Sequence, residues 1–357
     1  MQHQTSVLPQ YSGRVEIHGR IYLNKLFAIG GIADADTIKI DVEPDSVRFR
    51  ESENSQWLKN LKILNDGYYY DDDHNLKPVV EVRSSFSTIR IRLQGIDAPE
   101  LHYGANQGNV QLDSNQQPKF DSAKKINYRQ NWGARATKEL MDFLTQYQYE
   151  ENGKKYVKAY AYSNVDSPSD LFDKFGRAIC DIAIAEDDTD INQWLVKQGW
   201  AFPDFYNSMS EMEVKILQQV GSGASNPPVG IRGSYSKSLV PFDFDMIFDR
   251  NNPSINVNQD KGDLNLPKFF RKQVDYEVLK KCGVSSFATL KDFIRSTNTQ
   301  CYKTEEVFEK SSPPMIYQLS DFIEENGYMD LNIGDLIYIE SEAQLVDKNG
   351  NIINKWY

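Results

Sequence analysis

One arginine and two carboxylates stand close together near the end of the first third of the chain. Arg92 is followed five residues later by Asp97 and then by Glu100. A guanidinium presents a planar, permanently charged fork to phosphate oxygens, whereas carboxylates can hold a hard cation or act as a general base. Together these residue types suit the hydrolysis of a phosphoester. Taken alone, the same pattern also fits a surface strand that ends in a polar turn.

A strand is expected to position these three side chains. Residues 89–94 alternate between apolar and polar side chains, which is typical of a half-buried strand. Gly95 then permits a bend, and Pro99 stiffens the exit from it. The charged residues of the motif are therefore expected to leave the end of the strand together.

Two further segments carry matching chemistry. Residues 31–40 (GIADADTIKI) predict a tight acidic turn that opens another strand and offers Asp36 beside a threonine hydroxyl. Residues 173–182 (DKFGRAICDI) predict a turn leading into a strand, with Arg177 at its start. Taken alone, each segment could have a purely structural role. Asp36 could be an ordinary turn residue, and Arg177 could be a solvated charge at a strand end.

Together, these segments resemble the staphylococcal nuclease (thermonuclease) family. Its pattern is an Asp-Gly-Asp-Thr turn, an Arg followed five residues later by Asp-x-Pro-Glu, and a Tyr-Gly-Arg turn. The resemblance spans roughly residues 20–240 and implies an α+β fold, namely an OB-fold five-stranded Greek-key β-barrel with packed helices. Helical patterns over 132–147, 191–198 and 209–220 agree with that arrangement.

The resemblance implies a metal site built from oxygen ligands. Asp36 and Asp97 resemble the calcium-binding carboxylates, and the backbone carbonyl of Ala98 takes a further ligand position. Glu100 is expected near the ion, through a water molecule. One Ca²⁺ ion is expected, ahead of Mg²⁺ or Mn²⁺.

The same resemblance implies catalytic roles. Glu100 is similar to the general base that activates water. Arg92 and Arg177 are similar to the pair that grips the scissile phosphate and stabilises the more highly charged five-coordinate transition state.

Substrate contacts are expected beside these groups. Lys174 and Phe175 stand where the family has a Lys and a Tyr that contact a terminal phosphate, although Phe lacks the hydroxyl. Phe205 and Tyr206 stand where tyrosines lie near the nucleotide, so either could stack on a base; packing in the core is the alternative for Phe205. Ala35 departs from the pattern, because Gly is usual there and a positive φ would strain Ala.

The acidic composition of the chain disfavours long-range electrostatic attraction of DNA or RNA. The chain has 40 Lys and Arg against 51 Asp and Glu, a net charge of -11. Binding of DNA or RNA must then rely on local contacts. Three cysteines without a CxxC pair give no sign of a disulfide framework.

Neither a signal peptide nor a membrane span is expected. The first residues lack a basic and then apolar leader, and no stretch approaches 18 apolar residues. As written, the protein is expected to be cytoplasmic or released without a Sec signal, and secreted if a signal peptide was trimmed. No membrane partner is expected.

The chain is longer than one barrel requires. We expect a nuclease domain at 13–248 with insertions at about 42–88 and 101–131, a polar linker at 249–263, and a smaller α+β C-terminal module of unknown function at 264–357. This module could bind a protein partner, regulate the barrel or stabilise it.

Basic residues gather at the start of the C-terminal module. They are Lys268, Arg271, Lys272, Lys280 and Lys281, interleaved with aromatic residues. They predict an amphipathic helix with a solvated basic face, or an auxiliary nucleic-acid surface. The last residues predict a β-hairpin that joins 336–339 to 352–353 through a turn at Asn349–Gly350.

The residues therefore predict a metal-dependent nuclease, specifically a Ca²⁺-dependent one, that hydrolyses the phosphodiester bonds of DNA and, as a second substrate, RNA. The alternative is a catalytically weak or inactive member that serves as a nucleic-acid-binding or protein-scaffold module. A third possibility is that the C-terminal module dominates and the barrel is its effector.

Overall fold

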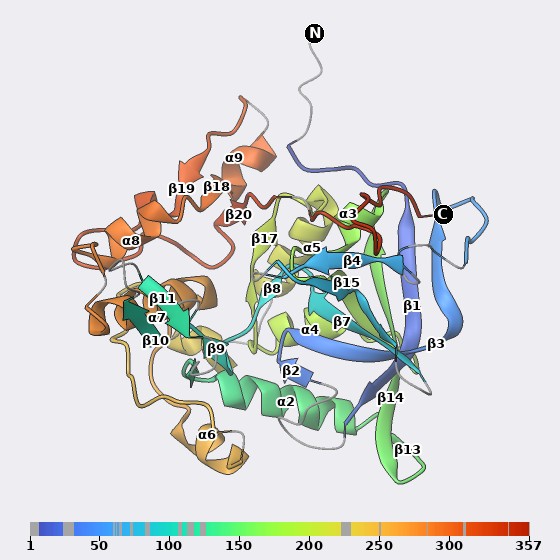
Figure 1. Cartoon of the computed structure of the whole chain (residues 1–357), viewed down its shortest axis with the longest axis horizontal. Coiled ribbons are helices and arrows are strands. Elements are labelled where there is room, and N and C mark those ends of the chain that lie inside the picture. The colour runs from blue at the N-terminus through green and yellow to red at the C-terminus, as the bar shows by residue number, and fades with distance from the viewer. Residues whose placement is uncertain are drawn as a thin grey trace.

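The computed structural model describes residues 7–23, 32–59, 61, 63, 66–71, 74–82, 86–105, 109–112, 118–121, 126–222, 230–249, 251–283, 285–309, 312–341 and 343–356. A closed β-barrel occupies one side of the molecule, and the helices of the C-terminal region lie on the other side (Figure 1).

Five strands form the barrel. They are β1 (Arg14–Tyr22), β3 (Thr37–Arg50), β7 (Ser87–Leu93), β14 (Lys154–Asn164) and β15 (Ala178–Ile184). The order is β3-β1-β14-β15-β7, and β7 pairs back with β3 to close the barrel. All neighbours are antiparallel except β15 and β7, which are parallel. The predicted OB-like α+β fold is confirmed.

Alternating sequence explains why these segments pair as they do. Ile89, Ile91 and Leu93 of β7 are all buried, as the alternation predicted. Val15 and Ile17 of β1 point into the same core. Side chains of successive strand residues face opposite sides, so each strand contributes every second residue to the core.

Three of the helices that cover the barrel coincide with the predicted ones. They are α2 (Gly133–Thr145), α4 (Ile191–Lys197) and α5 (Glu211–Ser222). The side chain of Asp190 accepts a hydrogen bond from the backbone N–H of Gln193 at 2.8 Å and so caps the start of α4. None of the helices among the described residues is long and apolar enough to cross a lipid bilayer.

The other helices and strands of the described residues lie around the barrel and in the C-terminal region. Around the barrel they are β2 (Ile32–Asp34), β4 (Tyr68–Tyr70), β5 (Leu76–Pro78), β6 (Val80–Val82), β8 (Ile96–Asp97), β9 (Tyr103–Gly104), β10 (Asn109–Leu112), β11 (Pro118–Asp121), β12 (Asn127–Tyr128), β13 (Tyr149–Glu151), α3 (Pro168–Leu171), β16 (Phe202–Pro203), β17 (Phe205–Tyr206) and η2 (Gly230–Ser234). Farther along they are α6 (Pro253–Gln259), α7 (Pro267–Lys281), α8 (Leu290–Ser296), β18 (Gln300–Lys303), α9 (Thr304–Glu309), β19 (Tyr317–Gln318), η3 (Leu319–Phe322) and β20 (Leu336–Tyr338).

The C-terminal region both has a core of its own and shares that of the barrel. Phe269 and Tyr276 of α7 pack in a separate apolar cluster with side chains of α8 and β20. Strand β20 also pairs in parallel with β17 of the barrel domain. Near the end of the chain, the ring of Trp356 stacks on Phe49 at 4.7 Å between centroids, and its Nε1–H donates to the carbonyl of Asp166 at 2.9 Å.

The predicted C-terminal hairpin is wrong. Strand β20 is buried at all three residues and pairs with β17 on one side and β18 on the other, so neither edge is left for residues 352–353. The turn at Asn349–Gly350 does form, but it brings Val346 and Ile352 together.

Replacing Trp356 with Ala should destabilise the protein, because a nearly buried aromatic ring leaves the barrel cluster. The expected loss in free energy of unfolding is about 3–5 kcal/mol, measured by chemical denaturation. Ile352→Ala, four residues earlier and 64% exposed, is the control and should change stability by no more than about 0.5 kcal/mol. Equal effects of the two changes would contradict the docking of the chain end on the barrel.

Candidate active site

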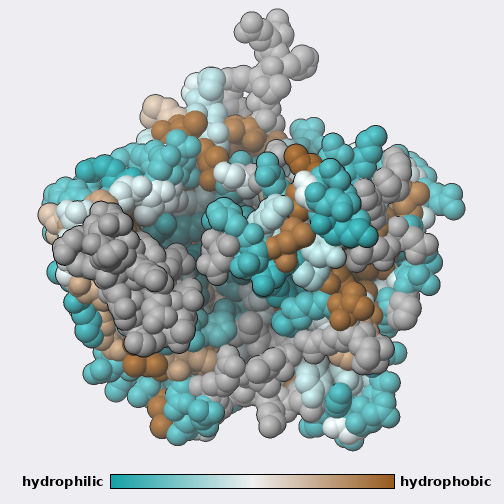
Figure 2. Space-filling model, viewed as in Figure 1, coloured by the Kyte–Doolittle hydropathy of each residue, from teal (hydrophilic) through white to brown (hydrophobic). Residues whose placement is uncertain are grey.

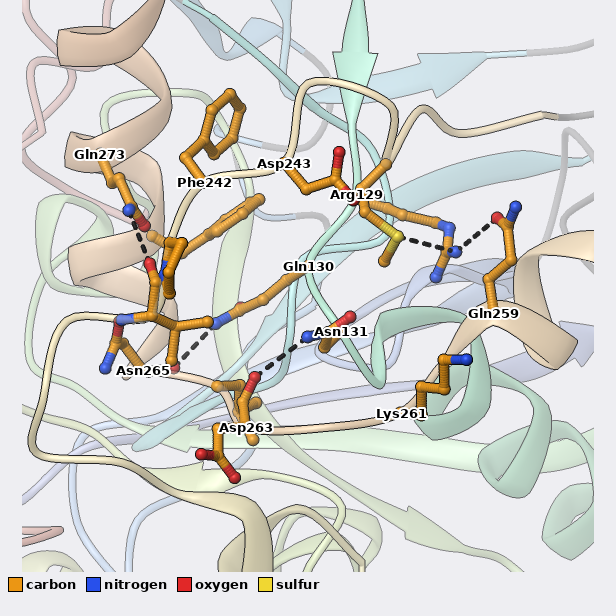
Figure 3. Close-up of a pocket in the computed structure, with 15 residues that line it drawn as sticks. Arg129, Gln130, Asn131, Phe242, Asp243, Gln259, Lys261, Asp263, Asn265 and Gln273 are labelled. Carbon is orange, nitrogen blue, oxygen red and sulfur yellow. Dashed lines mark hydrogen bonds between the residues drawn. The ribbon is translucent and has the colours of Figure 1, made fainter.

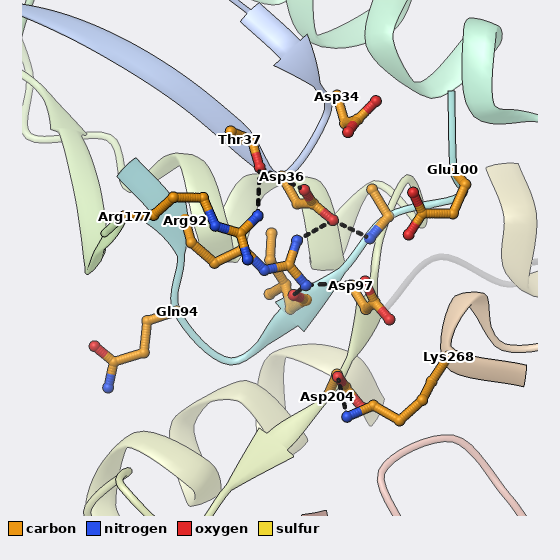
Figure 4. A network of polar contacts seen from close by, with 12 residues as sticks. Asp34, Asp36, Thr37, Arg92, Gln94, Asp97, Glu100, Arg177, Asp204 and Lys268 are labelled. Atoms are coloured by element: carbon orange, nitrogen blue, oxygen red, sulfur yellow. Dashed lines mark hydrogen bonds and ion pairs between the residues drawn. The ribbon is translucent and has the colours of Figure 1, made fainter. Parts of the chain in front are cut away.

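Charged side chains from separate parts of the chain meet at one end of the barrel (Figure 4). Asp36 comes from the turn between β2 and β3, Arg92 from the end of β7, and Asp97 from β8. Glu100 follows β8, and Arg177 immediately precedes β15. The structure therefore brings together the five side chains that the sequence predicted as the metal and catalytic groups.

Arg92 connects two of these carboxylates. Its strand neighbours are Thr37 on β3 and Ile179 on β15, so the backbone of Arg92 is held from both sides. The guanidinium forms an ion pair with Asp36 and donates to Asp97 Oδ1 at 2.9 Å. Gly95, with a φ of 70°, then makes the predicted bend that turns Asp97 back toward the arginine.

The turn that carries Asp36 forms without glycine. Asp36 Oδ1 accepts from the Thr37 hydroxyl at 3.1 Å, and Oδ2 accepts from the Ala98 backbone N–H at 3.0 Å. Ala35 is buried and is absent from the described residues with positive φ. The strain considered for Ala35 therefore does not arise.

Gln130, three residues before α2, and Gly133 at the start of α2 lie against the backbone of Glu100. The N–H of Gln130 donates to the Glu100 carbonyl at 2.7 Å, and the Glu100 N–H donates to Gln130 Oε1 at 3.3 Å. A Cβ atom on Gly133 would lie 2.4 Å from that same carbonyl oxygen. The close approach requires glycine at the start of α2 and fixes where the Glu100 side chain begins.

Arg177 reaches the site from the turn before β15. Its Nε donates to Asp173 Oδ2 at 2.7 Å, and a terminal nitrogen lies 3.5 Å from the Thr37 hydroxyl. The side chain of Arg177 is 26% exposed, compared with 13% for Arg92. Arg177 is thus the more accessible of the two predicted arginines.

The first insertion contacts this turn. The hydroxyl of Tyr69, in β4, accepts from Arg90 at 2.7 Å, and the same guanidinium donates to the carbonyl of Phe175 at 2.8 Å. A Cβ atom on Gly176 would lie 2.2 Å from the Tyr69 ring. Part of this insertion therefore borders the place where Arg177 enters the site.

Two cations of α7 also enter the site, and the sequence analysis did not place them there. Arg271 donates to Asp97 Oδ2 at 2.8 Å and to Oδ1 at 3.1 Å, and it forms an ion pair with Glu100. Lys268 lies 3.9 Å from Asp204. Their side chains are 23% and 12% exposed, so a solvated basic face is wrong for these two residues.

Asp204 is a further carboxylate that the sequence analysis missed. Strand β16 pairs with β8, placing Phe202 opposite Asp97, and Asp204 is the next residue after β16. Its N–H donates to the carbonyl of Gly95 at 2.9 Å, and its Oδ2 accepts from the Tyr206 hydroxyl at 2.6 Å. No local pattern marks this residue, because the pairing with β8 is what brings it to the site.

The predicted substrate contacts divide into two groups. Phe205 is fully buried in the core of the barrel, so its proposed stacking on a base is wrong and its alternative role in packing holds. Tyr206 is covered on its ring by the Lys268 ammonium group, 4.5 Å from the centroid. Lys174 and Phe175 are exposed in the turn beside Arg177, and their contact with substrate stays a prediction.

Burial and neighbouring charges give Asp97 and Glu100 very different pKa values. Burial raises the pKa of Glu100 to about 7, with Asp34 and Asp97 acting in the same direction and Arg271 opposing them. Burial acts on Asp97 in the same way, but Arg271 and Arg92 lower the pKa of Asp97 to about 2. Asp97 is therefore ionised at neutral pH, whereas Glu100 exchanges its proton close to neutrality, as a general base does.

The expected metal ligands are carboxylate oxygens, which suit Ca²⁺, but these oxygens already accept hydrogen bonds from N–H groups of the protein. Both Asp97 oxygens accept from Arg271, and Asp36 Oδ2 accepts from Ala98 N–H while it pairs with Arg92. Within the described part of the chain, no three Asp, Glu, His or Cys side chains are grouped as ligands for a metal ion. With Arg271 in place, this arrangement does not fit Ca²⁺. Ca²⁺ binding at this site is still only a prediction, and it would require Arg271 to move away from Asp97.

A cavity of about 310 Å³ lies apart from these groups (Figure 3). Gln130, Asn265, Phe242 and Lys261 are among the residues that line it, and none of the predicted catalytic or metal residues does. Gln130 connects the two places, because its Nε2 donates to the Asn265 carbonyl at 2.7 Å while its Oε1 accepts from Glu100.

Comparison with known proteins agrees with the geometry of the barrel. Residues 90–231 match the family model described as staphylococcal nuclease homologue. No curated protein matches the chain. The match includes Arg92, Asp97, Glu100 and Arg177, whereas Asp36 precedes it and α7 follows it.

The pKa of the Glu100 carboxyl group should be about 7, because burial raises it from its usual value of 4.5. Carboxyl ¹³C NMR of protein labelled at glutamate Cδ should show one resonance with that midpoint, and the resonance should be missing from Glu100→Gln. Glu186→Gln, an exposed position on the β15–α4 connection, is the control and should leave it in place. A midpoint for Glu100 at or below 4.5 would contradict the effect of burial.

Proposed function

Because residues 90–231 match the family model described as staphylococcal nuclease homologue, we propose that this protein is a nuclease that hydrolyses phosphodiester bonds in DNA and RNA. The family match itself indicates a nuclease-type or nucleic-acid-binding function. Hydrolysis is favoured by one observation, the convergence of Glu100 with Arg92 and Arg177 at the end of the barrel.

Glu100 is proposed as the general base. Its deprotonated carboxylate takes a proton from a water molecule, and the water oxygen forms a bond to phosphorus. The P–O bond to one sugar oxygen then breaks, and that leaving oxygen takes a proton from solvent. A phosphodiester is anionic and repels hydroxide, so a base that generates the nucleophile next to the phosphate lowers the barrier. The pKa of Glu100, raised by burial to about 7, suits a base that works near neutral pH.

The two arginines are proposed to divide the remaining work. Attack gives a five-coordinate phosphorus whose oxygens carry more negative charge, and guanidinium groups stabilise that charge. Arg177 is the more exposed arginine and is tied mainly to Asp173, so it can turn its remaining N–H groups to phosphate. Arg92 is engaged by Asp36 and Asp97, and its main contribution is to hold the site in place.

Substrate capture is proposed to be local. The chain carries a net charge of -11, so long-range attraction of nucleic acid is weak. Lys174 and Phe175 are exposed beside the half-buried Arg177, so the turn presents basic and aromatic side chains at the edge of the site. The face shown in Figure 2 is mainly hydrophilic, with apolar patches that are small and scattered.

A binding function is the second candidate, and one observation favours it. Arg271 forms an ion pair with Glu100, so the proposed base is held by a cation. A nucleic-acid-binding module would not need Glu100 to accept a proton. The two candidates therefore differ in whether Glu100 affects cleavage or only the structure of the site.

Glu100→Gln should lower the cleavage rate by about 10²- to 10⁴-fold, because Gln cannot accept a proton. Arg177→Ala should lower it by about 10²- to 10³-fold, because transition-state charge loses a partner. Cleavage is measured on single-stranded DNA, duplex DNA and RNA, with Ca²⁺, with Mg²⁺ and with EDTA.

Arg135→Ala, an exposed arginine on α2, is the matched control and should cut like the wild type. Binding of uncleaved oligonucleotide by fluorescence anisotropy separates capture from hydrolysis. A wild-type protein that binds but cuts nothing under any condition would favour the binding function.

The rate should also rise with pH. Glu100 acts in its deprotonated form, and its pKa is raised to about 7, so the base is protonated below that pH and available above it. The logarithm of kcat/KM should increase by about one per pH unit below 7 and level off above it. A rate already level from pH 5 upward would exclude Glu100 as the base.

A further inference from the structure

A guanidinium from α7 lies between Asp97, which the resemblance assigns as a metal ligand, and Glu100, which it places near the ion through a water molecule. Arg271 donates to both oxygens of Asp97, at 2.8 Å and 3.1 Å, and forms an ion pair with Glu100. A forked, bidentate pair of this kind is among the strongest hydrogen-bonded ion pairs in proteins. The same oxygen atoms are those that a hard cation would need.

Arg271 is carried by a helix that is packed on two sides. Phe269, two residues earlier, lies in the core of the C-terminal region, and Phe270 and Val274 lie in a second apolar cluster against the 101–131 insertion. The hydroxyl of Tyr103 in that insertion donates to Asp275 of α7 at 3.1 Å. The position of Arg271 is thus set by the packing of α7 rather than by a flexible arm.

The charges of the cluster are consistent with this placement. Asp97 lies between two guanidinium groups, those of Arg92 and Arg271. A divalent ion added next to two guanidinium groups would meet two positive charges at close range. Without Arg271, Asp97 would be a buried charge with one positive neighbour fewer, which is costly unless another cation takes the place of the guanidinium.

We propose that Arg271 is a resident cation: its guanidinium takes the place of a divalent ion between Asp97 and Glu100 and prevents Ca²⁺ from binding there. The proposal concerns the carboxylates of the proposed nuclease, and it gives the C-terminal region a direct role at that site. Arg271 acts on the reaction through Glu100 and Asp97, so it is a positioning residue.

The test measures Ca²⁺ binding by isothermal titration calorimetry and by the shift in Tm, using the full-length chain without substrate. Wild type should give no binding heat with millimolar Ca²⁺ and the same Tm in Ca²⁺ and in EDTA. Arg271→Gln should bind one Ca²⁺ per chain, and its Tm should rise as Ca²⁺ is added. Asp97→Asn introduced into the Arg271→Gln protein should abolish that binding.

Two further variants serve as controls. Arg271→Lys keeps a positive charge and should remain without Ca²⁺ binding. Arg295→Gln removes an arginine from α8 that is 57% exposed and pairs only with Asp292 among the described contacts; it should behave like the wild type. Arg271→Met, which also removes the charge, replaces Arg271→Gln if that protein does not fold.

The proposal is overturned if the wild type binds one Ca²⁺ in a manner that Asp97→Asn abolishes. It is equally overturned if a folded, uncharged Arg271 variant binds no Ca²⁺. Nuclease activity is not part of either readout, so the failure of this inference and the failure of the proposed nuclease function are separate results.

Discussion

The arrangement of this end of the barrel depends on one buried carboxylate. Asp97 is almost inaccessible to solvent, and it stays ionised because Arg92 approaches from β7 and Arg271 from α7. A buried charge without partners is too costly to keep, so both guanidinium groups are required by the position of Asp97. The barrel, the strand-end turn and the C-terminal helix are joined through this one side chain.

Much of the barrel side of the site could be predicted from short patterns. Alternation over 89–94 predicted β7 and its buried face, and the helical pattern over 191–198 predicted α4. These patterns work because they are local: a strand with one buried face and a capped helix leave a trace in neighbouring residues. Arg92, Asp97 and Glu100 lie within nine residues, so one bend is enough to bring them together.

The rest of the site could not be predicted because its contacts join distant segments. Arg271 and Asp97 are 174 residues apart. The sequence around a basic residue of a helix does not indicate whether its side chain will contact water or a distant carboxylate. Asp204 is brought in by the pairing of β16 with β8, which are two residues long each. Phe205 was expected near the substrate, yet its side chain is fully buried in the core of the barrel. Its sequence position predicted a place near the site but not the direction in which the ring points.

Arg271 is synthesised long after the carboxylates that it contacts. Ribosomes synthesise a chain from its N-terminus, and Glu100 precedes Arg271 by 171 residues. At 5–20 residues per second, the carboxylates wait about 10–30 s for this arginine. During that interval the acidic groups lack the guanidinium of Arg271, and in its first part they also lack that of Arg177. The site reaches its final charge only after most of the chain has been synthesised.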